Sequence, residues 1–163
     1  MARVYIGIGS NIEPRRHIRV GLRQLRRRFG SLTLSTVYAN PPVGFHGADF
    51  LNLVVGFDTG LSVRAVLNQL HAIEATHRYH GEGRRFAPRA LDLDLLLYDE
   101  LVLHEPQLHI PRAEILRYAF VLCPLAEVAG ERRHPQLGRT FAELWAAFDR
   151  THTRLTPVAL DMD

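Results

Sequence analysis

The sequence of 163 residues contains no lysine, so arginine supplies every basic side chain other than histidine. The absence of lysine excludes a lysine-containing phosphate-binding loop, a Schiff-base lysine and a lysine general base. We attribute the arginine bias to the base composition of the genome and do not interpret each arginine as selected for function. The formal net charge of +3 is modest and permits an anionic substrate without requiring nucleic acid.

Cysteine and long apolar runs are also scarce. Cys123 is the only cysteine, which excludes an internal disulfide and fits a reducing cytoplasm. No apolar run approaches the roughly 20 residues of a membrane span, and the first residues lack the apolar core of a signal peptide. Because there is no repeat, low-complexity tract or linker, residues 1–163 are expected to form a single domain. We therefore expect a cytoplasmic protein that does not bind membranes.

One stretch, residues 85–98, has the sequence RFAPRALDLDLLLY and predicts a β-strand entered through a stiff turn. Pro88 fixes its own φ and favours extended geometry in the residue before it. From Ala90 on, the side chains should alternate between two faces, and one buried face then carries Leu91, Leu93, Leu95 and Leu97. The other face then carries Asp92 and Asp94, followed by Leu96 and Tyr98.

Two aspartates that share one face of a strand lie about 6–7 Å apart at their Cα atoms. Paired carboxylates beside a leucine-rich strand are unfavourable unless a positive charge lies between them. Arg89 is one candidate for that charge. A divalent metal is the other, since Mg²⁺ commonly binds one or two carboxylates together with substrate phosphates. The simplest alternative is two acids on the solvent face of an ordinary amphipathic strand.

The patterns along the whole chain predict a β-α-β-β-α-β order with a C-terminal extension. Strands are predicted over residues 2–9, 32–39, 50–58, 90–98 and 101–103, with loops over 40–49 and 106–112. Helices are predicted over residues 14–29, after a cap at Ser62, over 113–120 and over 141–148. This order is typical of the ferredoxin-like α+β fold, an antiparallel sheet with helices packed on one face.

Two basic segments have alternative interpretations. The arginines of the helix at 14–29 suggest a nucleic-acid surface, but no aromatic side chains are interleaved for stacking, so we favour a solvated face. The loop at 78–85 contains two glycines and has the composition of a lid over a phosphate site. There Arg84 and Arg85 can bind phosphate oxygens in bidentate fashion. The alternative for this loop is a plain solvated connection.

The complete stretch 85–98 closely resembles the signature of the 6-hydroxymethyl-7,8-dihydropterin pyrophosphokinase family. That signature runs Arg-aromatic-Gly/Ala-Pro-Arg-x-x-Asp-hydrophobic-Asp-hydrophobic-hydrophobic. The similarity extends in order from Gly9 to about Leu125, and it includes the Pro-Pro-Val-Gly loop and the following Phe50-Leu-Asn52 triplet. The resemblance implies transfer of an intact pyrophosphoryl group from ATP to the hydroxymethyl oxygen of the dihydropterin, a step of folate biosynthesis that leaves AMP.

The same resemblance implies a set of site residues. The pterin would be bound by Asn40, Pro41, Val43, Phe50, Asn52, Phe86 and Phe120. Two Mg²⁺ ions would be held by Asp92 and Asp94. ATP, the co-substrate, would contact Glu74, Arg84, Arg85, Arg89, Leu95 and Arg112. The catalytic residues would be Arg85, Arg89, Asp92 and Asp94. The expected partners of this monomeric enzyme are small molecules, with no nucleic acid and no membrane.

Four positions depart from the family pattern. The Gly-Arg-x-Arg of the family's mobile loop is out of register here, around Tyr79. Gln107 and Tyr118 stand where the family has arginine, and Arg112 stands where it has histidine. The metal and pterin elements therefore match better than the part that clamps the phosphates of ATP. Neighbouring arginines could restore the missing charge: Arg78, Arg84, Arg85, Arg112 and Arg117.

Three other interpretations remain open at the level of sequence. The chain could be a divergent paralogue with altered or absent pyrophosphokinase activity. It could be a pterin- or nucleotide-binding homologue without catalysis, although such a protein gains nothing from retaining Asp92 and Asp94. A ferredoxin-like RNA-binding module would need exposed aromatic residues on its central strands, where this chain carries acids.

Overall fold

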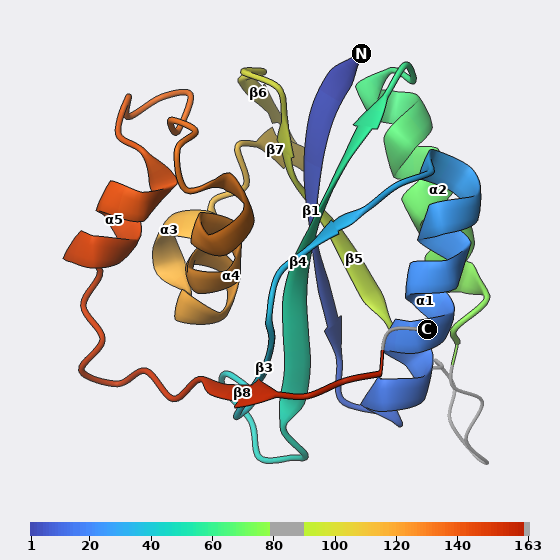
Figure 1. The fold of residues 1–163 in the computed structure, drawn as a ribbon, viewed down its shortest axis with the longest axis vertical. Helices are drawn as coiled ribbons and strands as arrows, with labels where there is room; N and C mark the ends of the chain where they lie inside the picture. The colour runs from blue at the N-terminus through green and yellow to red at the C-terminus, as the bar shows by residue number, and fades with distance from the viewer. Residues whose placement is uncertain (79–89, 162–163) are drawn as a thin grey trace.

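The computed structural model describes residues 1–78 and 90–161 (Figure 1). Its main sheet has the order β5-β1-β4-β3-β8, and β2 pairs with β4 outside this order. The strands are β1 (Ala2–Ser10), β2 (Thr33–Leu34), β3 (Val37–Asn40), β4 (Phe50–Thr59), β5 (Asp92–Tyr98) and β8 (Thr156–Val158). All of these pairings are antiparallel. The order β5-β1-β4-β3, with its two intervening helices, confirms the predicted ferredoxin-like core.

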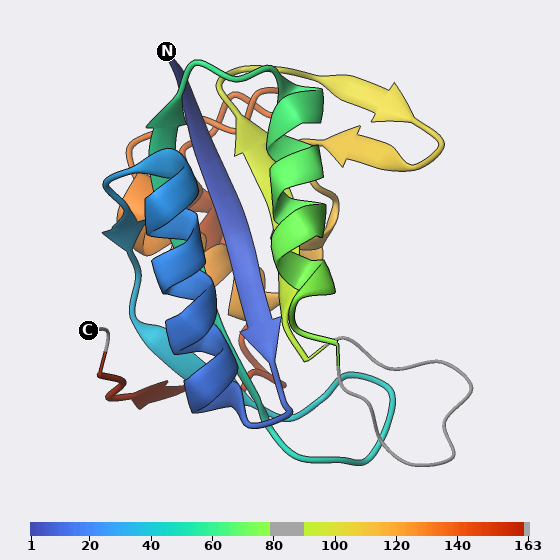
Figure 2. The ribbon, with the colours of Figure 1, turned by 90° about the vertical axis from the view of Figure 1, so that its right-hand side faces the viewer.

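Helices α1 (Pro14–Phe29) and α2 (Val63–Ala75) cover one face of the sheet (Figure 2). Pro14 begins α1 as predicted, and Gly30 ends it with a φ of 82°, a conformation that favours glycine. Ser62 caps α2, because its Oγ accepts a hydrogen bond from the Ala65 N–H at 3.2 Å. The larger core lies between these helices and the sheet and includes Ile6, Leu22, Leu70, Leu91, Leu93 and Leu95.

Helices α3 (Glu114–Arg117), α4 (Ala119–Ala129) and α5 (Phe141–Ala147) lie on the opposite face of the sheet (Figure 1). A second, smaller core joins them to the sheet and includes Tyr5, Val54, Leu96, Leu122 and Phe141. The helices of the βαββαβ core, α1 and α2, pack on one face as predicted, and the helices of the C-terminal extension cover the other face. Among the helices of the described ranges, none is long and apolar enough to cross a membrane.

Two predicted elements are divided in the structure. Ser35 splits the strand expected at 32–39, because its N–H donates to the Val54 carbonyl and its Oγ accepts from the Val54 N–H, both at 2.9 Å. A side chain thus replaces a backbone carbonyl in the ladder, which local sequence does not reveal. Tyr118 splits the helix expected at 113–120, since its φ of −121° and ψ of 129° are extended. This break separates α3 from α4.

The loop predicted over 106–112 is wrong in part. It contains β7 (Leu108–Ile110), which pairs with β6 (Leu103–Glu105) in a separate two-stranded hairpin. The strand predicted to begin at residue 101 begins in the structure at Leu103, two residues later. Three-residue strands carry too little alternation to be recognised from sequence, and here only their mutual pairing defines them.

Strand β5 follows the predicted alternation only as far as Leu96. Ile6 of β1 pairs with Leu95 and the adjacent Tyr5 pairs with Leu97, so Leu96 is the additional residue of a β-bulge. Leu96 and Leu97 both pack in the smaller core, whereas Tyr98 packs against the larger one. The predicted faces of Leu97 and Tyr98 are therefore wrong. Because the bulge follows Asp94, the faces of the two aspartates are unaffected.

A pair of histidines, buried His77 and half-buried His17, joins the end of α2 to α1. His77 is 3% exposed, and its Nδ1 lies 2.8 Å from the Nδ1 of His17. Its Nε2 lies 2.7 Å from the Oε1 of Gln24, an oxygen that can only accept, so His77 is protonated on Nε2. Burial lowers the pKa of His77 to about 4, with further lowering by the charges of His17 and Arg16. The neutral form of His77 is thus the one that the fold stabilises.

We expect the folded protein to lose stability as the pH falls from 6.5 to about 4, the ordinary and the folded pKa of His77. In that window the unfolded chain binds a proton that the folded chain excludes, so the full stability is present only above it. His77→Gln should reduce this acid-induced loss by about 1–2 kcal/mol, measured by urea unfolding at several pH values. The exposed His46→Gln is the control. An identical pH dependence in both variants would contradict the expectation.

Candidate active site

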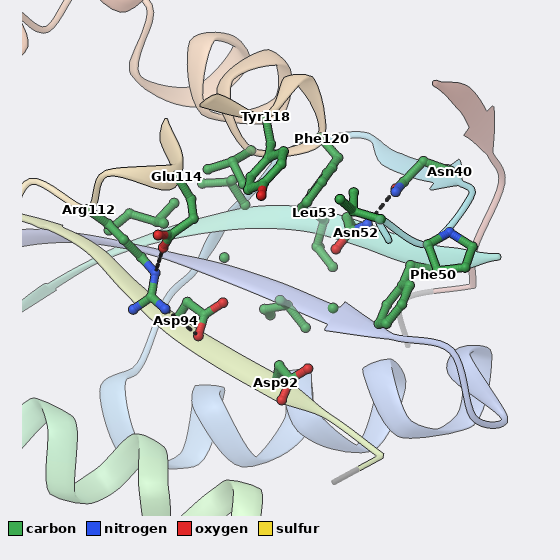
Figure 3. A pocket seen from close by; sticks show the side chains of 18 of the residues that line it. Asn40, Phe50, Asn52, Leu53, Asp92, Asp94, Arg112, Glu114, Tyr118 and Phe120 are labelled. Atoms are coloured by element: carbon green, nitrogen blue, oxygen red, sulfur yellow. Dashed lines mark hydrogen bonds and ion pairs between the residues drawn. The ribbon is translucent and has the colours of Figure 1, made fainter. Parts of the chain in front are cut away.

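A cavity of about 290 Å³ opens on the sheet face that carries α3 and α4 (Figure 3). Strands β1, β4 and β5, the loop after β3 and the first residues of α3 and α4 form its walls. Figure 3 shows Asp94, Arg112 and Glu114 at one end of the cavity. Asn40 and Phe50 lie at the other end, and Asp92 lies between them. The cavity therefore has a charged end and an end of amide and aromatic groups.

The floor of the cavity is the segment of β1 from Gly7 to Gly9, in which only Ile8 has a side chain, and that side chain packs in the larger core. Gly7 pairs with Asp94 of β5, and Gly9 pairs with Asp92. On the other side Gly9 also pairs with Asn52 of β4, and a Cβ on Gly9 would lie 2.7 Å from the Oδ1 of Asn52. The two glycines let a ligand approach the β1 backbone between the acids and Asn52. This role was not predicted from the sequence, although glycine at alternate positions, Gly7 and Gly9, along a predicted strand is a visible signal.

Asp92 and Asp94 both line the cavity, and this confirms the prediction that they share one face of a strand. The intervening Leu93 points the other way, is 4% exposed and belongs to the larger core. Both aspartates are half-buried, so they are partly desolvated and yet reachable from the cavity. This is a suitable environment for carboxylates that bind a cation together with a substrate.

Arg112 is held beside this pair. Its N–H donates to the carbonyl of Leu96 at 3.1 Å, which fixes the chain after β7 against β5. Its guanidinium lies 3.6 Å from Asp94 and forms an ion pair through Nε with Glu114. Arg112 thus lies where it can contact an anion bound near Asp94. Glu114 was not expected at the site, because its position depends on how α3 packs beside the sheet.

The charges of the described lining residues favour a cation. Three carboxylates, of Asp92, Asp94 and Glu114, face one guanidinium. Their hard oxygen atoms suit Mg²⁺ better than softer metals. Within residues 1–78 and 90–161, no three side chains of the usual ligand types form a complete metal site. The aspartates fit an ion that takes only part of its coordination from the protein and the rest from phosphate and water.

Aromatic and apolar side chains surround the other end of the cavity. Phe50 lies edge-on to Phe45, with ring centroids 6.4 Å apart, and Phe120 stacks on Tyr118 at 5.0 Å with 18° between the planes. Val43 and Phe45 line the cavity from the loop after β3, although they are 55% and 57% exposed. Exposed apolar groups at a cavity mouth are characteristic of a ligand site.

Polar recognition at this end comes from Asn52, which is 8% exposed. Its Nδ2 donates to the Oδ1 of Asn40 at 2.5 Å. The Nδ2 of Asn40 in turn donates to the carbonyl oxygen of Pro41 at 3.1 Å. An amide at the bottom of an aromatic-lined cavity can both donate to and accept from a heterocycle.

The remaining predicted site residues lie elsewhere or outside the described ranges. The Glu74 carboxylate is buried and accepts the Leu93 N–H at 2.8 Å, and the Leu95 side chain packs in the larger core. Pro41 lines an adjacent cavity of about 360 Å³, whereas Pro42 lines the cavity described above. Outside the described residues lie Tyr79, Arg84, Arg85, Phe86 and Arg89.

The positions that depart from the family signature fall in two places. Arg112 and Tyr118 line the cavity, on either side of α3. Gln107 is exposed in the turn between β6 and β7 and does not line the cavity. Arg117 lies next to Tyr118, with its guanidinium carbon 5.9 Å from the centroid of the tyrosine ring. Arg112 therefore provides positive charge at the acidic end, and Tyr118 supports the aromatic end.

The fold resembles solved structures whose descriptions name HPPK-DHPS. One from Plasmodium falciparum superposes with a TM-score of 0.69 at 12% sequence identity. The match covers 89% of this chain and 43% of that chain, so this chain spans less than half of those longer proteins. At this identity the likeness concerns the fold.

Sequence comparison gives closer relatives. A Pseudomonas aeruginosa protein named 2-amino-4-hydroxy-6-hydroxymethyldihydropteridine pyrophosphokinase is 39% identical over 155 residues, which cover 89% of this chain and 91% of that protein. A Methylorubrum extorquens protein with the same name is 35% identical over 156 residues, covering 91% and 95%. The family model for 7,8-dihydro-6-hydroxymethylpterin-pyrophosphokinase matches residues 5–130. This chain therefore belongs to the 7,8-dihydro-6-hydroxymethylpterin-pyrophosphokinase family.

Proposed function

We propose that this chain transfers a diphosphoryl group from ATP to the hydroxymethyl oxygen of 6-hydroxymethyl-7,8-dihydropterin, in folate biosynthesis, and that it requires Mg²⁺ bound at Asp92 and Asp94. The observation that carries the proposal is a single cavity with an aromatic and amide end beside a pair of carboxylates. A flat heterocycle and a polyphosphate need these two environments at adjoining positions. Family membership supports the same reaction.

The aromatic end suits the pterin. The rings of Phe50 and Phe120 reach the cavity from β4 and from α4 and can stack on the heterocycle. Asn52 offers an acceptor and a donor to the amide edge of the ring. Val43 and Phe45 gain contacts once a ligand covers them. In this arrangement the hydroxymethyl group extends over the glycine floor toward Asp92 and Asp94.

The acidic end suits the phosphates of ATP only with added positive charge. Mg²⁺ would supply Lewis acidity at the phosphate oxygens and template the two substrates. Asp92 and Asp94 would hold it from one side of the cavity. Arg112 would neutralise a phosphate oxygen from the other side, near α3. Further ATP contacts by Arg84, Arg85 and Arg89 remain part of the proposal. The buried side chains of Glu74 and Leu95 do not line the cavity, so we no longer assign them to ATP.

The reaction places few chemical demands on side chains. The hydroxymethyl oxygen forms a bond to the β-phosphorus of ATP, the bond from that phosphorus to the α,β-bridging oxygen breaks, and AMP leaves. The hydroxyl proton passes to solvent or to a carboxylate of the cavity. The chain contributes by orienting the two substrates and by placing charge near the transferred group, so no nucleophilic side chain is needed.

Several properties of the molecule remain proposals. We infer a single domain over residues 1–163, a monomer, a cytoplasmic location and no binding of nucleic acid. In the absence of metal, the carboxylates that line the cavity would repel a polyanion such as nucleic acid. We infer that Asp92 and Asp94 would hold two Mg²⁺ ions, which would supply more positive charge near a diphosphoryl group than one ion.

The reaction is tested by incubating the protein with ATP, MgCl₂ and the dihydropterin and separating the nucleotides. We expect AMP and the pterin diphosphate in equal amounts, with no ADP. Omission of Mg²⁺ should abolish both products. Formation of ADP would indicate transfer of a single phosphoryl group. Tight pterin binding without AMP would instead favour the non-catalytic binding homologue.

A further inference from the structure

A directed chain of hydrogen bonds lies beneath the aromatic end of the cavity. The Nδ2 of Asn52 donates to the Oδ1 of Asn40 at 2.5 Å, and the Nδ2 of Asn40 donates to the Pro41 carbonyl at 3.1 Å. Asn40 is 6% exposed and Asn52 is 8% exposed. Both side chains line the cavity, one from the end of β3 and one from β4.

The direction of this chain is determined by its last acceptor. A carbonyl oxygen accepts and cannot donate, so the Pro41 carbonyl requires the NH₂ end of the Asn40 amide. The oxygen of Asn40 then faces Asn52, and only the NH₂ end of Asn52 can pair with it. An inverted Asn52 amide would place two carbonyl oxygens against each other in a buried site, which is unfavourable.

The fixed direction determines what Asn52 presents to a ligand. Figure 3 shows the Asn52 nitrogen directed toward Asn40 and its oxygen directed away from it. That oxygen lies over Gly9, where a Cβ would approach it to 2.7 Å. The acceptor of the amide is therefore on the β1 side, and the second N–H of Nδ2 remains as the donor on the β3 side.

We propose that Asn40 is a positioning residue that fixes the polarity of the Asn52 amide and thereby the face on which the heterocycle is bound. This inference rests on the proposed function. Stacking between Phe50 and Phe120 does not distinguish the two faces of a flat ring. An amide edge does, because turning the ring over exchanges its N–H and its C=O. The same rotation moves the hydroxymethyl group from one side of the ring axis to the other.

Only one of the two bound orientations directs the hydroxymethyl group at the aspartates. With the acceptor of Asn52 fixed on the β1 side, the ring N–H must lie there and the ring carbonyl must lie toward β3. Asn40 thus converts a symmetric aromatic slot into a site that accepts the substrate in one orientation. Its effect reaches the reacting atoms through Asn52, and Asn40 itself need not touch the transferred group.

Two replacements that keep the number of side-chain heavy atoms separate polarity from packing. Asn40→Leu removes the acceptor for Asn52, whereas Asn40→Asp keeps an acceptor oxygen in either protonation state. For Asn40→Leu we expect kcat/KM for the dihydropterin to fall roughly tenfold or more, with KM for ATP unchanged. For Asn40→Asp we expect a loss of about threefold or less. The exposed Asn68 of α2, replaced by Leu and by Asp, provides the matched controls.

A second measurement reports the orientation directly and does not depend on turnover. The bound dihydropterin, labelled with ¹³C in its hydroxymethyl group, should give one NMR resonance with the unaltered protein and with Asn40→Asp. Asn40→Leu should give two, one for each face. If the unaltered protein binds the pterin but forms no AMP, these resonances still test Asn40 while the proposed reaction fails. A single, unshifted resonance in Asn40→Leu, or equal losses in kcat/KM for Leu and Asp, would overturn the inference.

Discussion

Replacing Asp94 by asparagine should lower kcat by at least about a thousandfold, which corresponds to roughly 4 kcal/mol of transition-state stabilisation. Asp92→Asn should have an effect of the same order. Each change keeps the size of the side chain but removes a charge from a cavity that must hold a cation against a polyphosphate. Because both side chains lie apart from the aromatic end, pterin affinity without ATP should change by no more than about twofold.

The measurement is AMP formation at saturating substrates, combined with Mn²⁺ binding by electron paramagnetic resonance. Asp58→Asn is the matched control, since Asp58 is an exposed acid on β4 that forms an ion pair with Arg3 at 3.5 Å. Loss of turnover together with loss of Mn²⁺ binding would assign both aspartates to the metal. If either variant kept more than about a tenth of the kcat, the proposed metal site would be wrong.

Removal of either Phe50 or Phe120 should weaken pterin binding by about 10- to 100-fold. Stacking of a heterocyclic ring on an aromatic side chain contributes about 1–3 kcal/mol, and each phenylalanine would provide one such contact. Both side chains are only partly buried, so Phe→Ala should leave the fold intact. The double variant should bind the pterin more weakly than either single one. Fluorescence titration with the dihydropterin measures these affinities.

Conservative replacements separate stacking from simple filling of the cavity. Phe→Tyr keeps the ring and should retain affinity within about threefold, whereas Phe→Leu keeps apolar volume and should resemble Phe→Ala. Tyr118, which stacks on Phe120 at 5.0 Å, holds this ring in place before any ligand binds. Leucine variants that bind as tightly as the unaltered protein would show that the two rings do not enclose the pterin.

Sequence alone located the parts of the fold and site that depend on local pattern. The alternation of leucine and aspartate predicted the face shared by Asp92 and Asp94, since strand periodicity is local. Helix α1 was predicted over residues 14–29, which are its observed bounds. The βαββαβ order followed from the succession of these elements.

The parts that sequence did not reveal depend on contacts between distant segments. Gly7 and Gly9 form the cavity floor only because of the register of β1 with β5, and Leu96 is a bulge only in that pairing. The ion pair of Arg112 with Glu114 depends on how α3 docks beside the sheet. Such contacts are set by packing across the sheet, which short-range periodicity does not encode.

The two faces of β5 and of Leu91, which precedes it, have different roles, one in the core and one at the cavity. Leu91, Leu93 and Leu95 belong to the larger core, whereas the aspartates face a wall that rests on the smaller one. Substitutions in the wall from Arg112 to Tyr118 can therefore alter ligand contacts while the larger core stays intact. This wall is therefore the natural place to redesign substrate preference while keeping the scaffold.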